Sequence, residues 1–239
     1  EFLKTREFLR PYGIDSIIDF GENGFKGVLV ETINIMLDST KKSVSTKVIS
    51  TTMSKSIVQK SKYIFDNNLP YWIIYRDDFF DKVFGKMKFG IFDVFRDRQI
   101  TNQNTSLSKS DKYRVRVLKS RNILDTGELV DIDGYDAFID LDTLSKFTVS
   151  KFINNTKVYL TPNMTYKPRV IRKDAGYVVN GSVAILIPKG ESLYLTDKQL
   201  KYFSSDEFRA FYRIARNYQT RSLNIDKTSC YWFGINQLI

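Results

Sequence analysis

The stretch Asn180-Gly181-Ser182-Val183-Ala184-Ile185-Leu186-Ile187-Pro188 decides more about the fold of this chain than any other. Its uninterrupted apolar run over 183–187 indicates a strand that is buried on both faces. Asn180-Gly181 is typical of a turn before that strand, and Pro188 ends it because proline cannot donate to a central sheet ladder. Two later segments, Ser204-Ser205-Asp206-Glu207-Phe208-Arg209 and Arg221-Ser222-Leu223-Asn224-Ile225-Asp226, predict a capped basic helix and a polar strand entry. A buried strand followed by an amphipathic helix favours a mixed α/β fold.

The helix after this strand is predicted in some detail. Ser204 and Glu207 have the spacing of a capping box, and the helical pattern continues to about Asn217. The helix carries a stripe of cations, spaced four and three residues apart, at Arg209, Arg213 and Arg216. The neighbouring arc is apolar and consists of Phe208, Phe211, Tyr212, Ala215 and Tyr218. We expect the helix to bury one side and to present cations on another.

The composition narrows the classes of function. The chain has 239 residues with 37 Lys and Arg against 27 Asp and Glu, a net charge of +10 that favours an anionic partner, nucleic acid before an acidic membrane. Cys230 is the only cysteine and histidine is absent, so an internal disulfide, a thiolate zinc site and imidazole catalysis are excluded. Neither a membrane-spanning run nor a signal peptide is recognisable, which predicts a cytoplasmic setting without a membrane partner.

The N-terminal third predicts a second, smaller sheet. A helix end over 1–10 is followed by buried strands at 14–20 and 30–37. Further on we expect an exposed hairpin or loop over 39–56, a short helix over 56–66, an extended segment over 71–76 and a helix over 77–85. The expected domains are 1–76 and 77–239. Because the chain starts at Glu1 within a helical pattern, we expect a fragment of a longer protein.

Several motifs resemble catalytic sites without matching them. Asn68-Leu69-Pro70-Tyr71 has Leu where the loop of an amino-methyltransferase has Pro, so a structural role is favoured. The glycine-rich loop 21–27 matches no nucleotide fingerprint. Asp131, Asp133 and Asp136 favour a turn over a metal site. We therefore predict neither catalytic residues nor a metal site.

The strongest functional signal is the segment 96–104, which mixes Arg with Asn and Gln. These side chains can make bidentate contacts to guanine and adenine edges, although a solvated polar loop is the open alternative. Two further basic segments, around 114–122 and 166–173, make a surface that follows phosphates plausible. The predicted DNA-binding residues are Arg96, Arg98, Gln99, Thr101, Asn102, Asn104, Arg116, Lys119, Arg121, Lys167, Arg169, Arg172, Arg216 and Arg221.

At these residues the sequence resembles the C-terminal part of an adenine-specific DNA methyltransferase of type II restriction-modification systems, and most of all the type IIS group. The strand Ile17-Ile18-Asp19-Phe20-Gly21, the loop residue Phe25 and the strand 30–35 resemble the end of the catalytic domain. The rest resembles a target-recognition domain, over the segments 90–104, 113–123, 161–187 and 208–225. The family's cofactor loop and its Pro-Pro-aromatic loop have no match in this sequence.

The resemblance implies a remnant of a doubly wound methyltransferase sheet, over 1–76, followed by a mixed α+β target-recognition domain. It implies double-stranded DNA as the partner, and a cognate restriction endonuclease as a further one. S-adenosylmethionine would serve the full-length enzyme, with no cofactor in this part. The fragment itself would be inactive, with its role in sequence-specific recognition for adenine-N6 methylation.

Two other classes of function stay open. The chain could be an interaction module in which the aromatic helix over 205–218 docks a nuclease or a second subunit. A self-contained hydrolase or nuclease is a third hypothesis, although no set of residues points to it.

Overall fold

The structure is a computed structural model that describes residues 3–28, 30–163, 167–190, 193–219 and 225–239. The chain forms two compact units. Unit 1 comprises Glu1–Phe84 and Arg213–Arg221, and unit 2 comprises Gly85–Tyr212 and Ser222–Ile239. The main division therefore falls at 84/85, where the sequence predicts a boundary at 76/77, and unit 1 also takes in a short segment from late in the chain.

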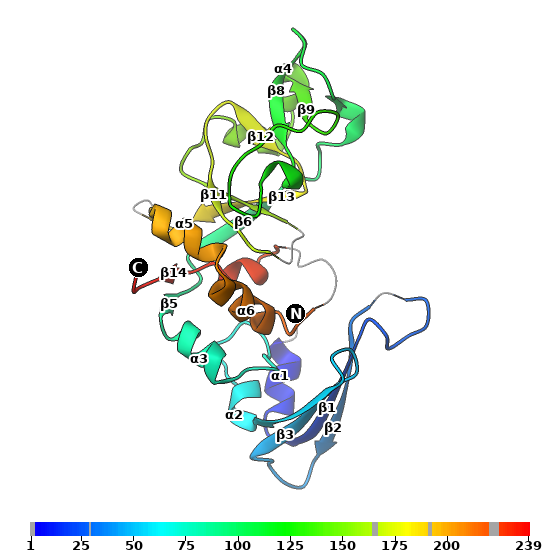
Figure 1. Cartoon of the computed structure of the whole chain (residues 1–239). Coiled ribbons are helices and arrows are strands. Elements are labelled where there is room, and N and C mark those ends of the chain that lie inside the picture. Colours follow the sequence, from blue (N-terminus) through cyan, green and yellow to red (C-terminus); the bar gives the residue numbers. More distant parts are fainter. Residues whose placement is uncertain (1–2, 29, 164–166, 191–192, 220–224) are drawn as a thin grey trace. The chain divides into compact units, whose positions relative to one another are not determined.

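Unit 1 is built on a mixed sheet, which is coloured blue to cyan in Figure 1. Its elements are α1 (Leu3–Leu9), β1 (Gly13–Gly21), β2 (Thr32–Asp38), β3 (Ser45–Ser50), β4 (Lys55–Lys60), α2 (Ser61–Ile64) and α3 (Asp78–Phe84). Among the described residues the strand order is β2-β1-β3-β4, and β1 runs parallel to β3 and antiparallel to β2. The two strands predicted at 14–20 and 30–37 exist as β1 and β2, but the predicted burial of the second is wrong, because Ile33, Met36 and Leu37 are 46%, 58% and 41% exposed.

The middle of unit 1 agrees with the sequence prediction over 39–56, where a hairpin was one of the two expectations, and differs from it over 56–66. The segment predicted as a hairpin or loop over 39–56 contains β3 and the start of β4, which pair as an antiparallel hairpin. The helix predicted over 56–66 is wrong in its first half, because β4 continues to Lys60 and only Ser61–Ile64 is helical. Pairing along β3 fixes an extended backbone over residues whose Ser and Lys content by itself favours a loop.

The core of unit 1 lies on one face of this sheet. Ile14, Ile17, Val48, Ile64 and Ile74 are buried there together. The opposite face is open, since Met36 is 58% and Val58 is 73% exposed. Because side chains alternate across a strand, this sheet has one packed and one solvent-facing side.

Unit 2 contains, in the part of the chain that is described, two four-stranded sheets and a two-stranded one. The first has the order β11-β10-β13-β6, the second β12-β8-β9-β7, and β14 pairs with β5. The strands are β5 (Met87–Lys88), β6 (Phe92–Arg96), β7 (Thr105–Ser106), β8 (Tyr113–Leu118), β9 (Ala137–Asp140), β10 (Tyr159–Pro162), β11 (Ile171–Arg172), β12 (Tyr177–Val179), β13 (Val183–Pro188) and β14 (Ile235–Asn236).

The helices of unit 2 are short. They are α4 (Leu141–Ser145), α5 (Asp197–Phe203) and α6 (Asp206–Ala215), with single 3₁₀ turns η1 (Asn102–Asn104), η2 (Ser120–Asn122), η3 (Thr148–Phe152) and η4 (Ser229–Trp232). The end of α6, from Arg213 onward, groups with unit 1. Among the helices that are described, none combines the length and the apolar character needed to cross a membrane.

Strand β13 lies in the interior of the first sheet, as its apolar sequence predicts. It pairs antiparallel with β10 on one side and with β6 on the other. Val183 and Ile185 face a core that both four-stranded sheets share, while Ala184 and Leu186 point to the other face, and all four are fully buried. The chain is therefore a mixed α and β protein, as predicted.

The predicted basic helix exists but begins later. α6 starts at Asp206, and Ser205, not Ser204, accepts a hydrogen bond from the Phe208 N–H at 3.2 Å. Ser204 instead ends the preceding helix, α5. After Ala215 the backbone of Asn217 and Tyr218 adopts positive φ angles of 50° and 54°, which closes the helix.

Candidate nucleic-acid interface

The loop 97–104 is held in shape by its own polar groups. The carboxylate of Asp97, which is 2% exposed, accepts the backbone N–H groups of Gln99 at 3.2 Å and Ile100 at 2.7 Å. The amide of Asn104 accepts from the Thr101 N–H and donates to the Gln99 carbonyl, both at 2.9 Å. Asn104 therefore fixes the loop, and its amide is engaged inside it.

Other side chains of this loop face solvent. Arg98, Thr101 and Asn102 are exposed, and among the described residues the side chains of Arg98 and Asn102 make no hydrogen bond. Gln99 is exposed too, but its side-chain oxygen accepts the Thr148 N–H at 2.8 Å. Arg96, the last residue of β6, is half-buried. Arg98 and Asn102 are thus the loop's side chains best placed to contact a ligand.

A tight turn before β13, formed by Asn180–Ser182, joins this loop to a second basic segment. A Cβ at Gly181 would lie 2.7 Å from the Asp97 carbonyl oxygen, so only glycine allows this close approach. The Ser182 hydroxyl accepts the Ser120 N–H at 3.0 Å, and the Asn180 N–H donates to Leu118. The turn brings the base of loop 97–104 and the end of β8 to one edge of unit 2.

Two cations after β8 lie against one aromatic ring. The Lys119 ammonium is 4.0 Å and the Arg121 guanidinium 4.7 Å from the centre of the Tyr135 ring. Burial lowers the pKa of Lys119, and the nearby Arg121 adds to this effect. Cations above an aromatic face are attracted by its quadrupole, which holds both side chains in place.

Arg116, which lies within β8, is paired with acidic groups. Its guanidinium lies 2.5 Å from Asp131 and 3.7 Å from Asp136, and it donates to the Val130 carbonyl at 3.2 Å. Its charge is therefore balanced within unit 2. The carboxylates at 131 and 136, predicted to form a turn, serve as its partners, and among the described residues no cluster of three potential metal ligands exists.

The third predicted basic segment, around 166–173, contacts the chain that follows the second one. Arg169 is only 8% exposed, and its Nε and Nη2 donate to the Ile123 carbonyl at 3.0 and 2.7 Å. Its other terminal nitrogen donates to the Lys167 carbonyl and lies 3.2 Å from Asp125, which also pairs with the Lys167 ammonium. Burial lowers the pKa of Arg169. The segment anchors the chain after Arg121, so the prediction of Arg169 as a direct phosphate contact does not fit its burial.

Two of the remaining predicted cations, Arg172 and Arg216, lie outside these loops. Arg172 pairs with Asp197 at 2.5 Å and donates to Leu195 at 2.7 Å. Arg216 belongs to unit 1, is 8% exposed and donates to Gln219 at 2.6 Å. Arg221 lies outside the described residues.

The arginine stripe of α6 is also not a uniform surface. Arg209 pairs with Asp206 at 3.2 Å, Arg213 is exposed, and Arg216 is buried. Along the neighbouring arc Phe208, Phe211 and Tyr212 are fully buried, as the amphipathic pattern predicts. These rings pack inside unit 2, so they offer no face for a docking partner.

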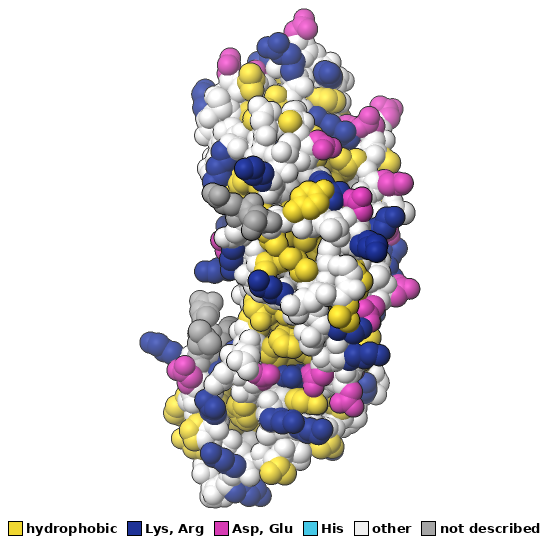
Figure 2. Space-filling model, turned by 90° about the vertical axis from the view of Figure 1, so that its left-hand side faces the viewer, with side chains coloured by type: hydrophobic (Ala, Val, Ile, Leu, Met, Phe, Trp, Pro, Cys, Tyr) yellow, Lys and Arg dark blue, Asp and Glu magenta, His cyan; other side chains and the backbone are white. Residues whose placement is uncertain are grey.

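The candidate interface is a loop cluster at one edge of unit 2. We define this loop cluster by Arg98, Asn102, Lys119, Arg121 and Tyr135. Tyr135 was missed by sequence reasoning, because a single Tyr after Asp-Gly is typical of any turn. On the face of the molecule shown in Figure 2, lysine and arginine side chains are interspersed with acidic ones.

Comparison with known proteins gives distant similarities. No protein-family model matches the chain. Over 99 residues it is 24% identical to a methylenetetrahydrofolate–tRNA-(uracil-5-)-methyltransferase of Mycoplasma mycoides subsp. mycoides SC, covering 41% of this chain and 22% of that protein. A solved structure, that of the type IIG restriction endonuclease BpuSI, is similar over 96% of this chain and 37% of its own length, with 9% identity and a TM-score of 0.43. The chain thus spans well under half the length of either protein. The candidate interface therefore rests on the residues of this chain alone.

Proposed function

We propose that unit 2 binds double-stranded DNA and reads its sequence, with Arg98 and Asn102 contacting base edges and Lys119 and Arg121 contacting phosphates. The observation that carries this proposal is the turn at 180–182, which joins both loops at one edge. Arginine and asparagine are the side chains that form bidentate contacts with guanine and adenine. Neighbouring cations supply the salt-dependent affinity that such contacts need.

The wider biological role extends this proposal. We propose that the chain is the recognition part of an adenine-N6 DNA methyltransferase of a restriction-modification system, which uses S-adenosylmethionine through residues outside this chain. The resemblance of Ile17–Gly21 and 30–35, and of the segments 90–104 and 113–123, to that family supports it. A cognate restriction endonuclease is the further partner that this role implies.

The direct test is a selection of bound duplexes from a random-sequence library, followed by fluorescence anisotropy on the preferred site and on a scrambled one. Replacing Arg98 or Asn102 with Ala is expected to cost about 1–3 kcal/mol on the preferred site and little on the scrambled one. Replacing Lys119 or Arg121 should weaken both duplexes alike. It should also reduce the slope of log affinity against log salt by about one per residue.

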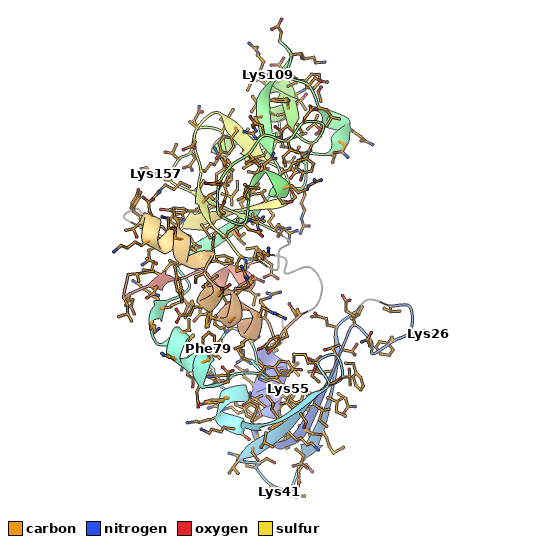
Figure 3. The ribbon with its side chains drawn as sticks, in the orientation of Figure 1. Lys26, Lys41, Lys55, Phe79, Lys109 and Lys157 are labelled. Atoms are coloured by element: carbon orange, nitrogen blue, oxygen red, sulfur yellow. The ribbon has the colours of Figure 1, made fainter. Side chains whose placement is uncertain are left out.

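Lys157→Ala provides the matched control. Lys157 is exposed and projects outward from unit 2, as the labelled side chain in Figure 3 shows, and it belongs to neither loop of the cluster. It should leave preference and salt slope unchanged. If Arg98→Ala and Asn102→Ala weakened preferred and scrambled duplexes equally, direct readout by this loop would be refuted.

A further inference from the structure

Unit 2 has a groove that lies outside the loop cluster. Its volume is about 320 Å³, and all of its lining residues belong to unit 2. The floor is β11 with Val170 before it, one wall is the turn around Gly127, and the other wall is the helix α5. β11 and α5 lie next to each other in Figure 1, and Arg172 of β11 pairs with Asp197 of α5. Because β11 is the last strand of its sheet, the groove follows a sheet edge.

The backbone of β11 turns one donor and one acceptor toward this groove. The Lys173 N–H donates to the Val158 carbonyl at 3.3 Å, and Arg172 opposes Tyr159 one step further along the ladder. Hydrogen-bonded and non-hydrogen-bonded pairs alternate in an antiparallel ladder, so the N–H and C=O of Arg172 point away from β10. Within the described part of the chain, neither group forms a hydrogen bond to a loop or a side chain. An added strand would satisfy both groups.

The two walls would hold such a strand from both of its faces. On one side Gly127, with a φ of +89°, lies against Ile171, because a Cβ on it would be 3.6 Å from the Ile171 side chain. Leu129 extends this wall. On the other side α5 lines the groove with positions 197, 200, 201 and 204, which share one helix face. Since side chains alternate along a strand, the one opposite Arg172 would face α5, and its two neighbours would face Gly127 and Leu129.

The charges of the groove define which side chains the added segment needs. Asp197 is already paired with Arg172. Lys201 is exposed and, among the described residues, forms neither a hydrogen bond nor a salt bridge. Asp174 is exposed as well and follows Arg172 by two positions, so an antiparallel strand would place there the residue two positions before the one opposite Arg172. An acidic side chain facing Lys201 and a basic one facing Asp174 therefore complement the groove.

We propose that the edge of β11 binds an extended segment of a partner protein, which it adds to the sheet as an antiparallel strand. One residue of this segment exchanges both backbone hydrogen bonds with Arg172 and carries an acidic side chain. Its two neighbours are apolar, and the residue two positions before it is basic. In strand addition the main-chain bonds supply affinity, and pockets for alternate side chains supply specificity. Such docking is independent of DNA binding by the loop cluster.

The probe is a fluorescein-labelled peptide, Thr-Lys-Val-Glu-Val-Thr with an amidated C-terminus, and fluorescence anisotropy follows its binding to the full chain. We expect saturable binding. Methylation of the backbone nitrogen of the peptide's Glu removes the N–H that donates to the Arg172 carbonyl, and it should weaken binding at least about tenfold. Equal binding of the methylated and unmethylated peptides, or no binding to folded protein, would overturn strand addition at this edge.

Arg172→Pro and Arg172→Ala form a matched pair of variants. Both remove the guanidinium and its bonds to Leu195 and Asp197, but only proline also removes the N–H that points into the groove. Proline is tolerated in an edge strand where its nitrogen faces away from the sheet. Arg172→Pro should bind the peptide at least about tenfold more weakly than Arg172→Ala, and thermal unfolding verifies that both fold. Equal binding by the two folded variants would contradict pairing with this N–H, and the methylated peptide tests the unaltered chain should the proline variant not fold.

Lys201→Glu tests the assignment of the acidic side chain. It should weaken binding of the probe about fivefold and favour a peptide whose central Glu is replaced by Lys. Lys198→Glu is the matched control, since Lys198 is exposed on the same helix and does not line the groove. A Lys201→Glu variant that keeps the preference for the Glu peptide would overturn this assignment.

Two further measurements separate strand addition from other events. Arg98→Ala and Arg121→Ala should bind the peptide as the unaltered chain does, so a failure of DNA binding does not imitate a failure of peptide binding. Analytical ultracentrifugation gives the oligomeric state. A dimer that Arg172→Pro dissociates would assign the edge of β11 to a second copy of the chain and would overturn the partner proposed for it.

Discussion

The sheets of the two units differ in how many of their faces are buried. In unit 2 the central strand β13 is buried on both faces, and even cations such as Arg169 and Lys173 lie inside, at 8% and 1% exposed. In unit 1 the sheet is packed on one face only, and on the other Val58 is 73% exposed. The same residue type therefore has a different role in each unit, since Val183 of β13 is fully buried and Val58 of β4 is a surface group.

This difference has a consequence for function. A basic composition alone suggests a cationic surface, but in unit 2 several cations are paired with carbonyls or carboxylates and stabilise the fold. Under the proposed function, the affinity for DNA depends on cations that are not paired in this way, such as Arg98 and Arg121 of the loop cluster. Substitutions in each unit test this difference.

The largest effect is expected for Leu186→Ala in β13. Its side chain is fully buried on the face opposite the shared core, and removing it leaves a cavity. The free energy of unfolding of unit 2 should fall by about 2–5 kcal/mol. Denaturant unfolding followed through the emission of Trp232, in a Trp72→Phe background, measures this for unit 2 alone. A loss below about 1 kcal/mol would mean that β13 is not central.

Next in size is Arg169→Met, which keeps most of the side-chain volume but removes the guanidinium. The Ile123 carbonyl loses both of its hydrogen bonds from Arg169, and unfolding should require about 3 kcal/mol less. Arg114→Met, at an exposed position of β8, is the control, with an effect within about 0.5 kcal/mol. Equal effects in a denaturant titration would contradict the structural role of Arg169.

Lys173 should give unit 2 a pH-dependent stability. Its ammonium donates to the carbonyls of Ile153 and Asp174, and burial lowers its pKa to about 8 from 10.5. Since the unfolded chain binds the proton more tightly, the unfolding free energy should rise between pH 8 and 10.5, by at most about 1.4 kcal/mol per pH unit. Below pH 8 this contribution is constant. Lys173→Met should flatten the rise in urea titrations across this window, and an unchanged slope would refute the assignment.

The smallest effect is expected for Val58→Thr on the open face of unit 1. Val58 is 73% exposed, so the substitution removes little buried apolar area and should change the unfolding free energy by less than about 0.5 kcal/mol. Emission of Trp72 in a Trp232→Phe background reports unit 1. A destabilisation comparable to that of Leu186→Ala would show that this face is packed in solution.

Local sequence patterns predicted the elements whose burial follows from their own periodicity. The apolar run of β13 and the aromatic arc of α6 lie where the pattern places them, because a regular element turns the same side chains inward whatever it packs against. Of the candidate site, the exposed Arg98 and Asn102 were predicted. Tyr135 was missed, since its role depends on Lys119 and Arg121 approaching its ring across a turn.

By itself, then, the sequence determined the strand β13, the helix α6 and which side chains carry charge or can read a base. Only the tertiary structure decided which cations are available. Arg169 meets the Ile123 carbonyl across 46 positions of chain, and Gly181 allows Asp97 to approach through the absence of a Cβ. Contacts between residues so distant along the chain leave no local periodicity, and burial of a charge depends on the partners that folding brings to it.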